Sequence, residues 1–184
     1  MKRKGTWIAL AILVVVLVAV FFYLNQRARA LSPPDTETLT TGGMSVEVKY
    51  NRPSVRGRLI FGTETQQALQ PFGAYWRLGA NEATRITFNR NILFNGTSVR
   101  AGNYRMYAVP GPDTFEIVLN SEEGNSASSQ PNPENDVLRT AIPVQRLQVP
   151  TETLTISLAP SGPGMDMIIE WSSVRLIVPL RIDH

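Results

Sequence analysis

The sequence predicts an all-β domain, an antiparallel β-sandwich of jelly-roll or immunoglobulin-like type, preceded by one transmembrane helix. The first observation is the run Trp7–Leu24, which contains no charged residue, proline or glycine. The second is that apolar and polar residues alternate in short segments from Met44 onward, with turn-forming residues between them. Three parts follow: an N-terminal tail and helix in 1–30, with the span at about 7–24, an extended tether in 31–43, and an exported β domain in 44–184.

The apolar run has the length of a membrane span. As a helix, its 18 residues extend about 27 Å, close to the thickness of a bilayer's hydrocarbon core. Basic residues flank it on both sides, with more before the run (Lys2, Arg3, Lys4) than after it (Arg27, Arg29). Because positive flanks stay in the cytoplasm, we expect a bacterial inner-membrane protein with a cytoplasmic N-terminus and a periplasmic C-terminal domain.

A cleaved signal peptide is the alternative for this segment. Ala28-Arg29-Ala30 satisfies the small-x-small rule for cleavage sites, and a basic tail followed by an apolar run is the usual order in signal peptides. The run is longer than the 7–15 residues of a typical signal peptide's apolar region. We therefore expect an uncleaved anchor, with the lipid bilayer as one partner.

The positive net charge of the chain comes from the basic residues that flank the apolar run. Of the 18 Lys and Arg residues, five flank the helix, which leaves 13 in residues 31–184 against all 15 Asp and Glu. The exported part is thus slightly acidic, and the net charge of +3 reflects membrane topology rather than nucleic-acid binding. The absence of cysteine excludes disulfides and thiolate chemistry.

The β domain is predicted segment by segment. Leu31–Gly43 has two prolines, two acids and a closing Gly-Gly pair, which is typical of a tether. Alternation with a period of two then predicts half-buried strands in six segments: Val46–Tyr50, Arg85–Phe88, Phe115–Asn120, Thr153–Leu158, Met165–Trp171 and Val174–Leu180. Their apolar faces predict a core between two sheets that includes Phe88, Phe115, Ile117, Ile156, Ile169 and Trp171.

The connections carry their own signals. Asn95-Gly96 is the strongest hairpin signal in the chain. Thr63–Gln70 has the composition for one or two helical turns. Ser121–Asn135 is a long polar stretch that breaks the alternation, so we expect a loop that is mobile or held by a partner.

Two motifs resemble a known family. Arg52-Pro53-Ser54-Val55-Arg56-Gly57-Arg58 has the pattern RPxxxGR, and the segment 76–84 reads WRLGANEAT. Together with AGNY at 101–104 and DVLR at 136–139, they resemble number 2911 of the bacterial families of domains of unknown function. The resemblance is specific for the family. It implies no activity, because none is established for the family.

The motifs also contain the candidate binding residues, which are polar or aromatic: Tyr50, Arg52, Arg58, Trp76, Arg77, Asn81 and Glu82. One interpretation is a polar pocket, in which arginines bind a carboxylate or sugar hydroxyls and Trp76 provides a stacking face. The other is a buried Arg–Glu pair that pins a long loop across the sandwich. We favour the second, because the GANEAT stretch leads directly into a predicted strand.

The groups required for catalysis are missing from the sequence. The only histidine is the last residue, His184, and no GxSxG elbow or glycine-rich phosphate loop is present. We therefore expect a protein that is not an enzyme and that uses no metal and no cofactor.

Two functions remain. The first is an accessory subunit whose periplasmic domain docks on and stabilises a larger inner-membrane complex, with other subunits of that complex as partners. Photosynthetic reaction-centre–antenna and respiratory assemblies are the candidates, since they carry single-span accessory subunits. The alternative is a membrane-tethered envelope module that binds a glycan or peptide. A groove lined by Trp76 and Tyr50 would favour this alternative.

Overall fold

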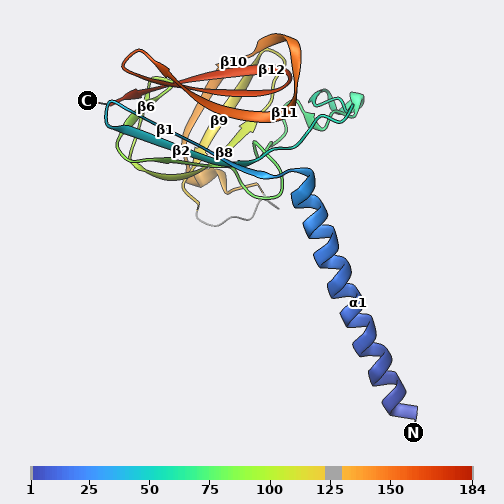
Figure 1. The fold of residues 1–184 in the computed structure, drawn as a ribbon. Helices are drawn as coiled ribbons and strands as arrows, with labels where there is room; N and C mark the ends of the chain where they lie inside the picture. The colour runs from blue at the N-terminus through green and yellow to red at the C-terminus, as the bar shows by residue number, and fades with distance from the viewer. Residues whose placement is uncertain (1, 123–129, 184) are drawn as a thin grey trace.

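One long helix projects from the end of a two-layered β-sandwich (Figure 1). The computed structural model describes residues 2–122 and 130–183. Its strands form a six-stranded and a four-stranded antiparallel sheet, together with a small parallel pair. The predicted sandwich behind one helix is confirmed.

Helix α1 covers Lys2–Leu31 and extends seven residues beyond the apolar run. At 1.5 Å per residue its 30 residues measure about 45 Å. Its segment Ile12–Leu31 is long and apolar enough to cross a membrane, a property that a signal sequence near an N-terminus shares. No described side chain of that segment is buried, and its contacts with the sandwich are made at its C-terminal end.

The larger sheet has the strand order β1-β2-β5-β8-β9-β10, and the smaller one has the order β11-β12-β6-β7. Their bounds are Pro34–Thr41 (β1), Met44–Asn51 (β2), Arg85–Phe88 (β5), Ile92–Phe94 (β6), Thr97–Val99 (β7), Gly102–Val109 (β8), Thr114–Asn120 (β9), Asp136–Pro143 (β10), Gln145–Ser161 (β11) and Gly164–Ile182 (β12). The parallel pair consists of β3, Phe61–Gly62, and β4, Gln70–Pro71.

The tether expected over residues 31–43 is wrong. Pro34–Thr41 forms β1, which pairs along its whole length with β2 at the edge of the larger sheet. Gly42 and Gly43, both with positive φ, make the turn between them. The segment is rich in threonine, which favours strands, and an edge position tolerates its polar residues.

The predicted strands are confirmed, and two of them are longer than expected. β12 has 19 residues and joins the segments predicted as Met165–Trp171 and Val174–Leu180. Ser172 lies between them with φ +54°, so the strand continues through a local irregularity. β11 pairs with β12 with two shifts of register.

The core lies between the two sheets, as predicted. The six side chains expected there are all at most 2% exposed. At one end, Phe61, Trp76, Phe115 and Trp171 form a cluster of aromatic rings. This aromatic end is the one nearest the helix, because Trp171 also lines a pocket that includes helix residues.

The connections agree with the turn chemistry. Asn95 and Gly96, with φ of +47° and +84°, connect β6 and β7 in a tight hairpin. Glu64–Gln66 is a single turn of 3-10 helix within the segment expected to be helical. Of the predicted loop Ser121–Asn135, residues 123–129 lie outside the described residues, and Pro133–Asn135 form a second 3-10 turn.

Candidate functional site

The C-terminal end of helix α1 is held by side chains of the sandwich. The last carbonyl groups of a helix have no partner within the helix and need one outside it. Asn81 donates through Nδ2 to the carbonyls of Ala28 (3.2 Å) and Ser32 (3.3 Å). Asn51 donates to the same Ser32 carbonyl at 3.1 Å. Two asparagine amides therefore cap the end of the helix.

Charged groups add to this attachment. The Arg56 guanidinium donates to the carbonyl of Leu31 at 2.8 Å, where a cation also complements the negative end of the helix dipole. Arg29 on the helix forms an ion pair with Glu82 at 3.5 Å, and both side chains are more than half exposed. The exposed pair contributes little stability in water. The hydrogen bonds therefore dominate the attachment.

The GANEAT stretch has a backbone shaped for this contact. Leu78 and Asn81 both have positive φ, +54° and +58°, in a region that asparagine tolerates better than leucine. Thr84 is buried and donates to the Leu78 carbonyl at 2.8 Å, which holds the loop. At Gly79 a Cβ atom would lie 3.1 Å from the Asn51 carbonyl oxygen, so a side chain there would push the loop away from β2. The motif thus places the Asn81 amide under the helix.

The RPxxxGR stretch forms a tight turn beside it. Arg56 and Gly57 have φ of +51° and +68°, and the Arg58 amide donates to the Val55 carbonyl at 3.1 Å. The Arg58 side chain folds back and donates to the carbonyls of Val55 (3.0 Å) and Ser54 (2.6 Å). Arg58 therefore stabilises its own turn and presents the rest of its guanidinium outward.

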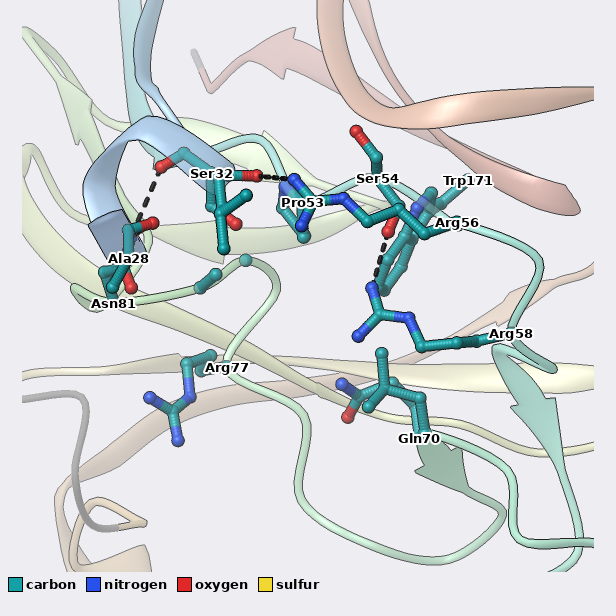
Figure 2. A pocket seen from close by; sticks show the side chains of 14 residues that line it. Ala28, Ser32, Pro53, Ser54, Arg56, Arg58, Gln70, Arg77, Asn81 and Trp171 are labelled. Atoms are coloured by element: carbon teal, nitrogen blue, oxygen red, sulfur yellow. Dashed lines mark hydrogen bonds between the residues drawn. The ribbon is translucent and has the colours of Figure 1, made fainter. Parts of the chain in front are cut away.

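A pocket of about 370 Å³ lies where the helix, this turn and the GANEAT loop meet (Figure 2). Its walls include three arginines and no acidic residue. Figure 2 shows Arg56 and Arg58 hydrogen-bonded to backbone carbonyls, while no dashed line reaches Arg77. The lining residues central to its chemistry are Ala28, Leu31, Arg56, Arg58, Arg77 and Trp171.

Tyr50 and Arg52, both predicted as binding residues, connect the two sheets instead. The Tyr50 hydroxyl accepts from the Ile156 amide at 2.9 Å, and it donates to the Asp35 carboxylate at 3.3 Å. Burial raises the pKa of Tyr50 to about 12. Arg52 pairs with Asp35 at 3.2 Å and donates to the Leu154 carbonyl at 3.3 Å. Both side chains are therefore occupied by contacts within the protein.

The structure changes one part of each interpretation of the motif, namely the role of Trp76 in the pocket and the burial of Glu82 in the ion pair. Trp76 is 2% exposed and stacks on Trp171 with ring centroids 5.7 Å apart, so it offers no face to a ligand. Glu82 does not form the predicted buried pair either, because its side chain is more than half exposed and pairs with Arg29 on the helix. A tryptophan in an irregular segment has no periodicity that would reveal its burial.

A second polar cluster lies at the other edge of the larger sheet, in the DVLR segment. The Tyr107 hydroxyl donates to Asp136 at 2.9 Å, and Arg139 donates to Tyr107, Asp136 and Glu116. Burial raises the pKa of Tyr107, and the Asp136 carboxylate raises it further. These groups satisfy one another, so the cluster fastens β8, β9 and β10 together. Within the described residues, no three His, Asp or Glu side chains are close enough to hold a metal ion.

Comparison with known proteins identifies the motifs. The model of the DUF2911 family, described as proteins of unknown function, matches residues 32–180. The chain belongs to this family, as the resemblance predicted. No match to a curated protein or to a solved structure accompanies it. The match begins at Ser32, so the residues that hold the helix lie inside the family domain and helix α1 lies outside it.

Proposed function

We propose that this DUF2911 protein is a single-span membrane-anchored accessory subunit, whose β domain docks on and stabilises a larger inner-membrane complex. The carrying observation is that the helix and the domain are fastened together. Asn81 and Arg56 bind carbonyls in the last turn of α1, Asn51 binds the carbonyl of the next residue, Ser32, and β1 begins only two residues after Ser32. A module that only needed to stay near the membrane would need no such attachment.

The exposed surface of α1 supports the same proposal. The side chains described in Ile12–Leu24 are about half exposed or more, and the apolar ones need lipid or another helix as a neighbour. The run has no Gly-xxx-Gly pattern and no polar residue in its interior, so the helix alone gives weak specificity in lipid. The domain, held in a fixed orientation, then supplies the specific contacts with a partner. Photosynthetic and respiratory assemblies are candidate hosts.

The alternative, a module that binds an envelope glycan or peptide, loses its main support. It rested on a groove lined by Trp76 and Tyr50, and these side chains are 2% and 3% exposed. Tyr50 also uses its hydroxyl within the protein. The absence of a catalytic set in the sequence supports a binding role rather than an enzymatic one.

The test is co-purification of tagged full-length protein in mild detergent, with partners identified by mass spectrometry. A Gly-Ser insertion after Leu31 separates the helix from the domain and should reduce the recovered complex severalfold. The same insertion at Gly162, in an open turn between β11 and β12, is the matched control and should leave recovery unchanged.

Two outcomes contradict the proposal. If wild-type protein recovers no membrane partner, the accessory role is wrong. If the insertion after Leu31 recovers as much complex as wild type, the fixed attachment is irrelevant to docking. Topology is tested separately by fusing, after His184, a reporter that is active only in the cytoplasm. If the fusion shows reporter activity, the periplasmic assignment is wrong.

A further inference from the structure

We propose that the pocket at the foot of helix α1 binds the phosphate of an anionic phospholipid headgroup. The inference rests on the proposed membrane anchoring and adds a ligand to it. It starts from the charge of the pocket, which has three guanidinium groups among its lining residues and no carboxylate.

None of these three arginines is neutralised by an ion pair within the described residues. The salt bridges there involve Lys49 or other arginines, and the nearby Glu82 is occupied by Arg29. Arg56 and Arg58 use part of their donors on backbone carbonyls. The Arg77 side chain makes no hydrogen bond in the described part of the chain. Three cations around one cavity repel one another unless an anion lies between them.

The donors suit a phosphate. A guanidinium presents parallel N–H groups that match two phosphate oxygens, and such charge-assisted pairs are stronger than neutral ones. Arg77 has its whole guanidinium available, and Arg58 keeps one terminal nitrogen that makes no hydrogen bond within the described chain. The indole N–H of Trp171, at the wall of the pocket, also has no acceptor in the described chain. The pocket therefore offers cationic donors to an anion and has no carboxylate among its lining residues to repel it.

The position of the pocket identifies the source of the phosphate. Ala28 and Leu31 lie four and seven residues beyond Leu24, the end of the apolar run, which is about 6–10 Å along the helix. A headgroup layer is roughly 5–7 Å thick on each side of the hydrocarbon core. The pocket thus starts within the headgroup layer when Trp7–Leu24 spans the membrane.

Apolar side chains at the same place fit the rest of a lipid. Leu31 and Leu69 line the pocket and are 40% and 39% exposed. They offer a surface for the glycerol backbone and the start of the acyl chains, which a free phosphate lacks. A phosphodiester lipid with net negative charge, such as phosphatidylglycerol, fits both the arginines and the apolar side chains of the pocket.

The experiment is native mass spectrometry of detergent-purified full-length protein, titrated with phosphatidylglycerol, phosphatidylcholine or inorganic phosphate. Wild type should retain phosphatidylglycerol in preference to the other two. Arg77→Gln should weaken that binding about tenfold, the effect of losing about one charge-assisted contact. Arg77→Lys keeps the charge without the paired donors and should give an intermediate affinity. Arg90→Gln removes the same charge from an exposed turn away from the pocket and should have no effect.

Arg77 makes no protein hydrogen bond, so its variants should keep the thermal stability of wild type, and this is measured first. Equal binding of phosphatidylglycerol by wild type and Arg77→Gln would overturn the proposal. Equal weakening by Arg77→Gln and Arg90→Gln would overturn it too, since the binding would then reflect overall charge. Inorganic phosphate that binds as tightly as the lipid would overturn the lipid assignment. Alkaline extraction of membranes tests the anchoring independently, so failure of the anchor and failure of the pocket give different results.

Discussion

The two sides of the aromatic cluster are stabilised by different kinds of interaction. On the inner side, Trp76, Phe115 and Trp171 pack in a dry interior with Phe61 between them. On the outer side, where Trp171 lines the pocket, the helix is attached by the exposed amide of Asn81 and the exposed guanidinium of Arg56. The core is stabilised by buried apolar surface and close packing, whereas the junction is stabilised by directed hydrogen bonds. Stability should therefore depend on the first region, and geometry on the second.

The largest expected effect is in the core. Phe115→Ala removes a ring that is 1% exposed and touches Phe61 edge-on at 5.0 Å. It should lower the free energy of unfolding by about 3–5 kcal/mol through lost transfer energy and a cavity. Chemical denaturation of the full-length protein in detergent measures it. If the free energy of unfolding falls by less than about 1 kcal/mol, as it does for a typical surface substitution, the core does not contribute more stability than the junction.

The next effect lies between the regions, at Tyr50. Tyr50→Phe leaves the Ile156 amide without its acceptor and should cost about 1–3 kcal/mol at neutral pH. The pKa is about 12 in the folded state and near 10 when unfolded, so the neutral form is favoured by folding. The resulting stability is complete below pH 10 and is lost as the pH rises to about 12. Denaturation across that window should show a steeper loss for wild type than for Tyr50→Phe.

At the junction the stability change is smaller and the geometric change is larger. Asn81→Gly keeps the positive φ and removes two hydrogen bonds, one to Ala28 in the helix and one to Ser32 directly after it, so it should cost about 1 kcal/mol. Because the chain has no native cysteine, two can be introduced for spin labels, one on α1 and one on the sandwich. The distribution of distances between them should broaden in the variant. An unchanged distribution would show that Asn81 does not fix the orientation of the helix.

The smallest effect is expected at the exposed ion pair. Glu82→Gln breaks the contact with Arg29, and both side chains are more than half exposed. It should change the free energy of unfolding by at most about 0.5 kcal/mol, and less at high salt. Thermal unfolding at low and high ionic strength measures it. A salt-independent loss above 1 kcal/mol would mean that the pair, rather than the amide caps, holds the junction.

These two regions also mark where sequence reasoning succeeds. The core was predictable because Ile86 and Phe88, or Phe115 and Ile117, alternate with polar neighbours along a strand. Strand β1 was missed because Leu39 is its only large apolar residue, so an edge strand and a tether look alike in sequence. The match between Asn81 and the helix was missed because a side-chain amide facing a backbone carbonyl 53 residues away leaves no pattern. Arg77 and Asn81 both line the pocket, but only Asn81 binds the end of the helix, and Glu82 pairs with Arg29 instead of with Arg77.

The fastening of α1 has a mechanical consequence. If α1 spans a membrane as proposed, its apolar run of about 27 Å fits an average hydrocarbon core, and the helix would tilt in a bilayer thinner than that run. A domain on a loose tether would not follow that motion, whereas this sandwich, attached at Asn81 and Arg56 within one turn of the helix end, would lean with the helix. The thickness of the surrounding bilayer would then set the face that the domain turns toward a neighbour.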